Sequence, residues 1–197
     1  NPKSRPYSRP AFNQTLSLQS EAAQRLIHQQ VPPVVAALYN IDVVLRVMAE
    51  PQQMDELDGL VSSMIEACRN ELTLDIARMN QLRADHLISE TPSYTSPASV
   101  AVSIISPQVR QVLSLIQQLD ELVGCMDALW LCGVLSNQQK ADGVYQSQRK
   151  IMRLGRRIIT LQKQAMAGVR ERQARKADEG SVTKVACVEV IDQLRLE

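Results

Sequence analysis

Residues 12–18 read Phe12-Asn13-Gln14-Thr15-Leu16-Ser17-Leu18. Apolar side chains in this run alternate with small polar ones. One parity holds Phe12, Leu16 and Leu18, and the other holds Asn13, Thr15 and Ser17. A period of two is typical of a β-strand with one face buried and the other exposed. The segment therefore predicts one short strand near the N-terminus.

Two helices are expected directly after this strand. Ser20 is a suitable N-cap and Glu21 places an acid in the first turn, so a helix is predicted over 21–30. Pro32 and Pro33 interrupt it, and Pro33 suits the first turn of a second helix that runs to about residue 50. The order strand, helix, helix is typical of the ribbon-helix-helix DNA-binding unit. The alternative is an edge strand of an ordinary helical domain, preceded by a disordered arm.

The rest of the chain is predicted to be helical. Apolar residues recur every three or four positions over 54–87, which indicates a long helix, and a loop rich in Ser, Thr and Pro follows at 89–97. Ser106, and the capping box of Ser136 with Gln139, mark two further helix starts. The remaining segments are assigned as a short helix over 98–105, a helix over 107–135, a helix from 137 to about 168, a break at 177–180, and a C-terminal tail or short helix over 181–197.

Composition supports a mainly α protein. The 197 residues are 45% hydrophobic and 3% aromatic, and they include 7 Gly and 9 Pro. So few Gly and Pro residues argue against a β-sandwich or barrel, which needs many turns. No apolar run approaches the roughly 20 residues that span a bilayer, and no secretory signal is visible. We therefore expect a cytoplasmic protein with no membrane partner.

Reactive side chains form none of the familiar catalytic or metal-binding patterns. There is no C-x-x-C pair, nucleophile elbow, phosphate-binding Gly-rich loop or H-E-x-x-H motif. The sequence therefore predicts no enzymatic activity, no metal and no cofactor. The cysteines are expected to be buried, small apolar residues in a reducing cytoplasm, and they are Cys68, Cys125, Cys132 and Cys187.

Charge is segregated along the chain, although the net charge is only +1. Residues 1–20 contain three basic side chains and no acid, whereas 42–127 has 13 acidic and 5 basic side chains, a net of −8. Residues 149–176 hold ten basic side chains against Glu171 alone. Basic regions at both ends indicate contact with a polyanion such as nucleic acid. For 149–176 the alternative is a solvated helix face that pairs with the acidic middle of the same chain.

A lone strand needs a partner for its backbone hydrogen-bonding groups, so two copies of the chain are expected to pair their strands antiparallel in a homodimer. Such a two-stranded ribbon fits the major groove of double-stranded DNA. The outward side chains of Asn13, Thr15 and Ser17 would then contact base edges. The ribbon and dimer core is expected to contain Phe12, Leu16, Leu18, Leu26 and Leu38.

Phosphate contacts are expected beside this ribbon. Lys3, Arg5 and Arg9 would neutralise phosphates from the N-terminal arm. The start of the second helix, at Val34 and Val35, would direct backbone N–H groups at a further phosphate.

From about residue 14 to 166 the chain resembles the AcaB-like regulators encoded by conjugative plasmids and related integrative elements. The resemblance rests on Leu16-Ser17-Leu18 followed by Ala22-Ala23-Gln24-Arg25-Leu26, on Ser96-Pro97-Ala98-Ser99-Val100-Ala101, and on 149–161 with its Gly155-Arg156-Arg157. It implies a ribbon-helix-helix dimer that regulates the transcription of conjugative-transfer genes as an activator, with the transcription machinery as a further partner. One departure is Val31-Pro32-Pro33, where many ribbon-helix-helix proteins have a Gly and a small polar residue. Proline has no N–H to offer a phosphate.

The chain is accordingly divided into a flexible basic arm at 1–10, a ribbon-helix-helix unit for DNA binding and dimerisation at 11–50, a helical domain at 51–180, and the tail at 181–197. The competing function is a helical scaffold or accessory protein of the transfer machinery that makes no DNA contact. The long third helix and the acidic middle are compatible with either function.

Overall fold

The fold is seen in a computed structural model that describes residues 10–45 and 51–193. Its elements follow the predicted order of a strand and then helices, so the expectation of a mainly α protein with an N-terminal ribbon is confirmed. Within the described ranges, no helix is both long and apolar enough to cross a bilayer.

The ribbon is formed by two strands of the same chain. Strand β1 (Phe12–Leu18) pairs antiparallel with β2 (Ala98–Ile104), and Thr15 lies opposite Ala101. The prediction of one strand per chain, paired across a dimer, is therefore wrong for the described chain, and so is the predicted helix over 98–105. Small residues at 99, 101 and 103 alternate with apolar ones at 100, 102 and 104, so β2 has the same half-buried pattern as β1.

Two consecutive helices follow β1, as predicted. Helix α1 (Glu21–Gln29) begins at Ser20, whose side-chain oxygen accepts a hydrogen bond from the Ala23 N–H at 3.3 Å. Helix α2 (Val31–Tyr39) begins almost at once and continues into a π-helical segment, η1 (Asn40–Leu45). The rest of the second predicted helix, residues 46–50, lies outside the described residues.

Three long helices complete the fold, α4 (Pro51–Asp85), α5 (Pro107–Leu131) and α6 (Asn137–Gln193). The predicted capping box at the start of α6 is present. Gln139 donates its N–H to Ser136 Oγ at 3.2 Å, and Ser136 donates its N–H to Gln139 Oε1 at 2.8 Å. The predicted break at 177–180 is wrong, because α6 continues through it. That stretch contains one Gly and no Pro, and a single Gly costs a helix only about 1 kcal/mol.

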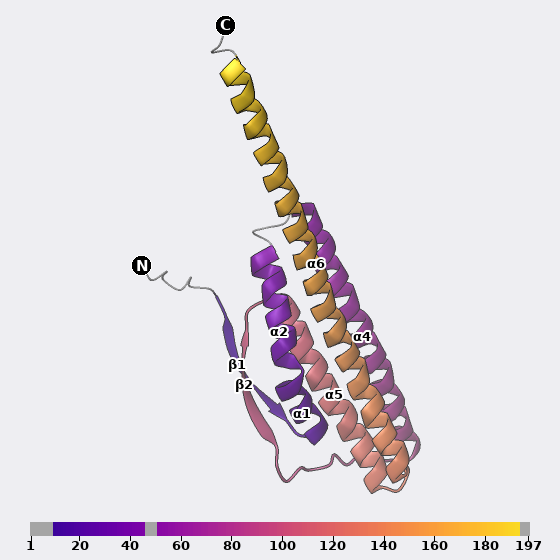
Figure 1. The fold of residues 1–197 in the computed structure, drawn as a ribbon. Coiled ribbons are helices and arrows are strands. Elements are labelled where there is room, and N and C mark those ends of the chain that lie inside the picture. The colour runs from indigo at the N-terminus through magenta and orange to yellow at the C-terminus, as the bar shows by residue number, and fades with distance from the viewer. Residues whose placement is uncertain (1–9, 46–50, 194–197) are drawn as a thin grey trace.

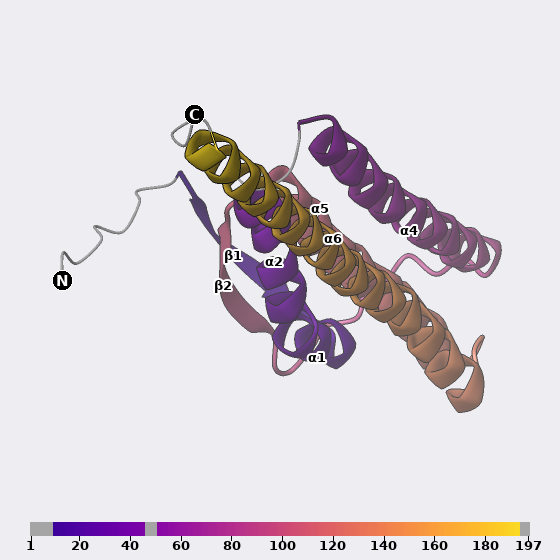
Figure 2. The same ribbon diagram turned by 45° about the horizontal axis from the view of Figure 1, so that its top comes forward.

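Helix α5 lies at the centre of the molecule. It packs on the ribbon, α1 and α2 on one side and on α4 and α6 on the other. Figures 1 and 2 show the ribbon and α4 on opposite sides of α5 and α6, while the C-terminal part of α6, yellow in Figure 1, extends beyond the other helices. Because it has partners on two sides, α5 buries 13 of its 25 residues, whereas Arg110, Gln117 and Glu121 stay exposed.

One hydrophobic core joins the ribbon to the long helices. It runs from Leu16 and Leu18 on β1, through Leu38 on α2 and Leu119 on α5, to Ile158 on α6. The second strand of the ribbon, β2, therefore comes from the region predicted as a separate helical domain, 51–180. The division of the chain into units at residue 50 stays a prediction.

Candidate nucleic-acid interface

The outer face of the ribbon is small, polar and exposed. In the antiparallel register, residues opposite one another project from the same face of a sheet. The three β1 residues predicted to contact bases are all exposed there. This face consists of Asn13, Thr15 and Ser17 of β1 and, opposite them, Ser103, Ala101 and Ser99 of β2. None of the six side chains carries a charge, so they offer hydrogen-bond donors, acceptors and a methyl group at one surface.

The inner face of the ribbon is buried in the core at one end of β1 and, at the other end of the ribbon, through Ile104 of β2, which pairs with Phe12. Leu16 and Leu18 are buried on β1, and Ile104 is buried on β2. Phe12, which the sequence places in the same apolar row, is 71% exposed. The parity of Phe12 was thus predicted correctly, but its burial in the core of the chain was not, because the core helices cover only the far end of β1.

Asp120 of α5 fixes the point at which the chain leaves the ribbon. Its carboxylate accepts the N–H of Gln19 at 2.9 Å, the N–H of Ser20 at 2.7 Å and the hydroxyl of Ser20 at 2.6 Å. Hydrogen bonds to an ionised acceptor are among the stronger ones in proteins. The end of β1 and the N-cap of α1 are therefore held on the central helix.

Gln24 of α1 ties the two strands together at the same end. Its side-chain amide donates to the carbonyl oxygen of Leu18, at the end of β1, at 3.2 Å. It also donates to the carbonyl oxygen of Ser96, just before β2, at 3.0 Å. Because these two residues are far apart in sequence, this bridge fixes the position of one strand relative to the other.

The loop that leads into β2 is held by a buried polar group. The Tyr94 hydroxyl donates to Asp127 Oδ2 at 2.7 Å, and Lys140 Nζ lies 2.5 Å from Asp127 Oδ1. Burial, followed by the hydrogen bond to Asp127, raises the pKa of Tyr94 well above its usual value. Tyr94 therefore stays neutral and keeps its role as a donor.

The opposite end of the ribbon carries a cation and an apolar hollow. The guanidinium of Arg110, in the first turn of α5, lies 5.8 Å from the centre of the Phe12 ring, within range for a cation–π contact. A hollow of about 430 Å³ lies here, lined by Pro10, Ala11, Phe12, Ile104, Ile105, Ser106, Pro107 and Arg110. Sequence reasoning did not single out Arg110, because its proximity to the ribbon depends on the packing of α5.

The four leucines expected in the ribbon and dimer core are buried within the single chain. Leu16, Leu18, Leu26 and Leu38 are each at most 3% exposed. They lie in the hydrophobic core that joins the ribbon to the long helices. A role in dimer contact is not available to them, because the long helices α5 and α6 already cover them.

The start of α2 differs from the expected phosphate contact. The helix begins at Val31 rather than Pro33, so Val35 lies within the helix, where its N–H is directed at the carbonyl of residue 31. Val34 lies in the first turn with its side chain buried. Pro32 and Pro33 have no N–H, so the two exposed residues at this helix end offer no donor to a phosphate.

The basic regions are only partly described. Lys3, Arg5 and Arg9 lie outside the described residues. In α6, Lys150 pairs with Asp75 at 2.5 Å and with Glu71 at 3.7 Å, so this member of 149–176 does contact the acidic middle of the chain. Among the described residues, no three His, Cys, Asp or Glu side chains gather as a metal site would require.

The half of the ribbon face on β2 escaped sequence reasoning. Ser99, Ala101 and Ser103 alternate with Val100, Val102 and Ile104. That alternation was the available signal, but Ala and Val also fit a helix, and no local feature identifies β1 as the partner.

This fold is similar to that of a protein of known structure. The chain is similar to the crystal structure of selenomethionine-containing AcaB from uropathogenic E. coli, with 36% sequence identity, a TM-score of 0.81, and 89% of each chain covered. The chain belongs to the AcaB family. No family model matches it, and no curated protein does. The AcaB-family resemblance seen in residues 14–166 is thereby confirmed, and it extends over nearly the whole chain.

Proposed function

We propose that the chain is a sequence-specific DNA-binding regulator of transcription that reads the major groove with the β1–β2 ribbon. The observation that carries this proposal is the exposed face of six small uncharged side chains on two paired strands. A face with no charge and no large apolar group is unsuited to an ordinary protein core, but it suits hydrogen bonding to base edges.

The dimensions of the ribbon support insertion into DNA. Paired strands lie about 4.8 Å apart, and the major groove is about 12 Å wide and admits a two-stranded ribbon. Asn13 can form two hydrogen bonds with adenine. The hydroxyls of Thr15 and Ser17 can donate to or accept from a base edge, and the methyl group of Ala101 can contact the methyl group of thymine. Because one chain supplies both strands, Ser99, Ala101 and Ser103 join the proposed base-reading set.

Phosphate contacts come from the cations nearest the ribbon. Lys3, Arg5 and Arg9 of the N-terminal arm immediately precede β1, and Arg110 lies at the same end of the ribbon. The backbone N–H of Val34 is not included, because in a helix that begins at Val31 it is directed at the carbonyl of Gln30. Cations beside an uncharged reading face would bind phosphates and position the DNA, while the face itself would read the sequence.

We also propose that the protein is a homodimer. Phe12 is 71% exposed and Ile105 is 38% exposed, and both line the hollow at the end of the ribbon. A second copy of the chain would cover this apolar surface and double the number of base pairs contacted. Sedimentation equilibrium should show a dimer that Phe12→Ser dissociates, and a monomer at all concentrations would contradict the dimer proposal.

Membership of the AcaB family supports the biological role. We propose that the protein acts in the cytoplasm as an activator of conjugative-transfer genes, in contact with the transcription machinery, and that its function is binding rather than catalysis. The family assignment and the ribbon face together support this role.

Salt-dependent DNA binding tests the proposal. Duplexes that bind the protein would be selected from a random pool, and affinities measured by fluorescence anisotropy at several salt concentrations. Thr15→Ala should reduce discrimination against a mutated site by about 1 kcal/mol or more. Arg9→Ala should weaken binding to all duplexes and reduce the salt slope by about 1. Failure to enrich any sequence would contradict the proposal.

A helical scaffold without DNA contact is the second candidate. Leu60 is 46% exposed and Leu74 is 58% exposed on α4, which lies on the far side of the molecule from the ribbon (Figure 2). Exposed leucines on one helix suit contact with another protein. Gel filtration with and without a selected duplex distinguishes the two functions, because the scaffold predicts no shift in elution.

A further inference from the structure

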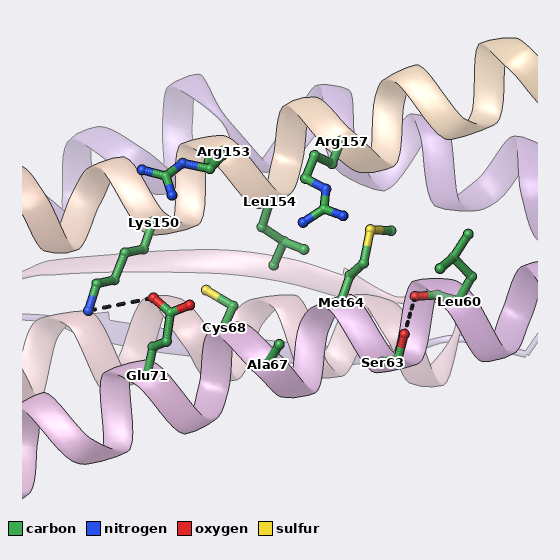
Figure 3. Close-up of a pocket in the computed structure, with 10 residues that line it drawn as sticks. All are labelled: Leu60, Ser63, Met64, Ala67, Cys68, Glu71, Lys150, Arg153, Leu154 and Arg157. Carbon is green, nitrogen blue, oxygen red and sulfur yellow. Dashed lines mark hydrogen bonds and ion pairs between the residues drawn. The ribbon is translucent and has the colours of Figure 1, made fainter.

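A basic hollow lies between α4 and α6, on the side of the molecule away from the ribbon. It encloses about 290 Å³, at the small end of the range for small-molecule sites. Figure 3 shows side chains from both helices converging on it. Its lining consists of Leu60, Ser63, Met64, Ala67, Cys68 and Glu71 from α4, and Lys150, Arg153, Leu154 and Arg157 from α6.

Two guanidinium groups in this hollow have no carboxylate partner among the described residues. Lys150 is engaged by Asp75 at 2.5 Å and by Glu71 at 3.7 Å. In contrast, neither Arg153 nor Arg157 forms an ion pair within the part of the chain that the structure describes. The charged residues lining the hollow are three cations and Glu71, so their net charge is +2.

The two arginines line the same hollow toward its opposite ends (Figure 3). They lie four residues apart on α6, so they project from neighbouring turns of the same helix face. In Figure 3 the Arg157 guanidinium points from α6 toward Met64 and Ser63, whereas Arg153 lies on the side of Lys150 and Glu71. A planar guanidinium binds phosphate or carboxylate oxygens through two parallel hydrogen bonds.

The floor between the arginines is apolar. Leu154 projects between them in Figure 3, and Met64 and Ala67 face it from α4. Burial raises the pKa of the Cys68 thiol to about 11, so this group is also neutral at physiological pH. A ligand that fills the hollow must therefore combine a charged head with an apolar body.

We propose that the α4–α6 hollow binds a small amphipathic anion, a phosphate monoester with a compact apolar substituent, between Arg153 and Arg157. The two guanidinium groups without a carboxylate partner among the described residues favour a dianionic phosphate over a monoanionic carboxylate. The inference does not depend on the proposed DNA-binding function. The residues that line the hollow belong to α4 and α6. Figure 2 shows α4 across the molecule from β1 and β2, so DNA bound to the ribbon would leave α4 uncovered.

Binding of phenyl phosphate to the full-length protein tests the proposal. Three comparison compounds each change one part of phenyl phosphate. Phenylacetate replaces the phosphate with a carboxylate, inorganic phosphate lacks the apolar ring, and phenol lacks the charge. Affinity would be measured by calorimetry, and the ¹³C methyl signal of Met64 would report occupancy of the hollow. Phenyl phosphate should shift that signal and bind at least about tenfold more tightly than each of the other three compounds.

Matched variants locate the site. Arg153→Gln and Arg157→Gln should each weaken phenyl phosphate binding by about tenfold, because each removes one guanidinium while keeping a long polar side chain. Arg156→Gln is the control. Arg156 is exposed on α6, donates to the Met152 carbonyl oxygen at 3.3 Å, and does not line the hollow.

Three results would overturn the proposal. The first is an unchanged Met64 signal at millimolar phenyl phosphate. The second is equal weakening of phenyl phosphate binding by Arg156→Gln. The third is a loss of affinity for a selected duplex in Arg153→Gln and Arg157→Gln, with the salt slope reduced as in Arg9→Ala. That last result would show that the two arginines contact DNA. It would not affect the test of the proposed function, which depends on variants of the ribbon such as Thr15→Ala.

Discussion

Asp120 of α5 holds Ser20 at the N-cap of α1 by two hydrogen bonds, one to the backbone N–H at 2.7 Å and one to the hydroxyl at 2.6 Å. A third reaches the N–H of Gln19 at 2.9 Å. One carboxylate on the central helix thus fixes the end of the ribbon, although Asp120 lies about a hundred residues after Ser20 in the sequence.

Asp120→Asn should lower the free energy of unfolding by about 2 kcal/mol, because it removes the charge from an acceptor of three hydrogen bonds and points an amide at backbone donors. Urea denaturation measures the loss. Glu121→Gln, at the neighbouring exposed position, is the control and should change stability by less than about 0.5 kcal/mol. Equal stability of the two variants would contradict the anchoring role.

Gly155→Ala should destabilise the contact between α6 and α2. A Cβ atom at residue 155 would lie 2.9 Å from Val34 Cγ2, and Val34 is a stiff, buried side chain. We expect a loss of about 1–3 kcal/mol in the free energy of unfolding. Gly168→Ala in the same helix has no atom closer than 4.0 Å to the new Cβ, and should instead gain about 0.5–1 kcal/mol from helix propensity. Partial recovery when Val34→Ala is added to Gly155→Ala would confirm the cause.

Leu87→Gly should stabilise the protein. Leu87 follows α4 with φ of 54°, and the N–H groups of Leu87 and Ile88 bond back to the carbonyls of Ala84 and Arg83. Gly133 has the same role after α5, with φ of 73°. Since Leu87 is 90% exposed, replacement loses little packing and relieves a left-handed conformation. Thermal unfolding should show a gain of about 0.5–1 kcal/mol for Leu87→Gly and a loss of about 1 kcal/mol for Gly133→Ala.

Stability should fall at alkaline pH because of Cys68. Burial raises its pKa to about 11 in the folded protein, from an ordinary value of 9.0, with Glu71 adding to the rise. The unfolded chain releases this proton first, so the stabilisation is complete below pH 9 and is lost as the pH rises toward about 11. The loss is of the order of 2 kcal/mol. Cys68→Ala should have lower stability at neutral pH and a flatter stability profile between these two pH values. An equally steep profile in Cys68→Ala would assign the fall to other groups.

The parts of the fold that the sequence predicts are those with local signals. The alternation at 12–18, the Ser20 cap and the capping box of Ser136 with Gln139 each depend on neighbouring residues, and the structure confirms all of them. The partner of β1 is a nonlocal property. Residues 98–104 lie some eighty positions away, and Ala and Val fit either regular structure, so their role emerged only from packing.

The limits of the prediction at the candidate site have the same origin. Parity assigns Phe12 to the inner face of β1, but it does not indicate how far α5 extends beneath that face. Spacing places Arg153 and Arg157 on one face of a helix, but the hollow beside them exists only because α4 packs against α6. Local patterns therefore predict which face a side chain belongs to, and tertiary packing decides what that face contacts.

Thr15 and Ala101 are partners in the register of the ribbon, so the proposed function predicts that both contribute to DNA recognition. Each can be replaced by Glu, which places a negative charge on the outer face. Ala77→Glu adds the same charge at an exposed position on α4, away from the ribbon. Circular dichroism and urea denaturation would confirm that all three variants remain folded.

The most direct test is the affinity of these variants for a selected duplex, measured by fluorescence anisotropy at one fixed salt concentration. Thr15→Glu and Ala101→Glu should each weaken binding by at least about a hundredfold, because an unpaired carboxylate would face base edges and phosphates. Ala77→Glu should bind as the unmodified protein does. Normal binding by folded Ala101→Glu would show that β2 takes no part in reading DNA, and would contradict the account.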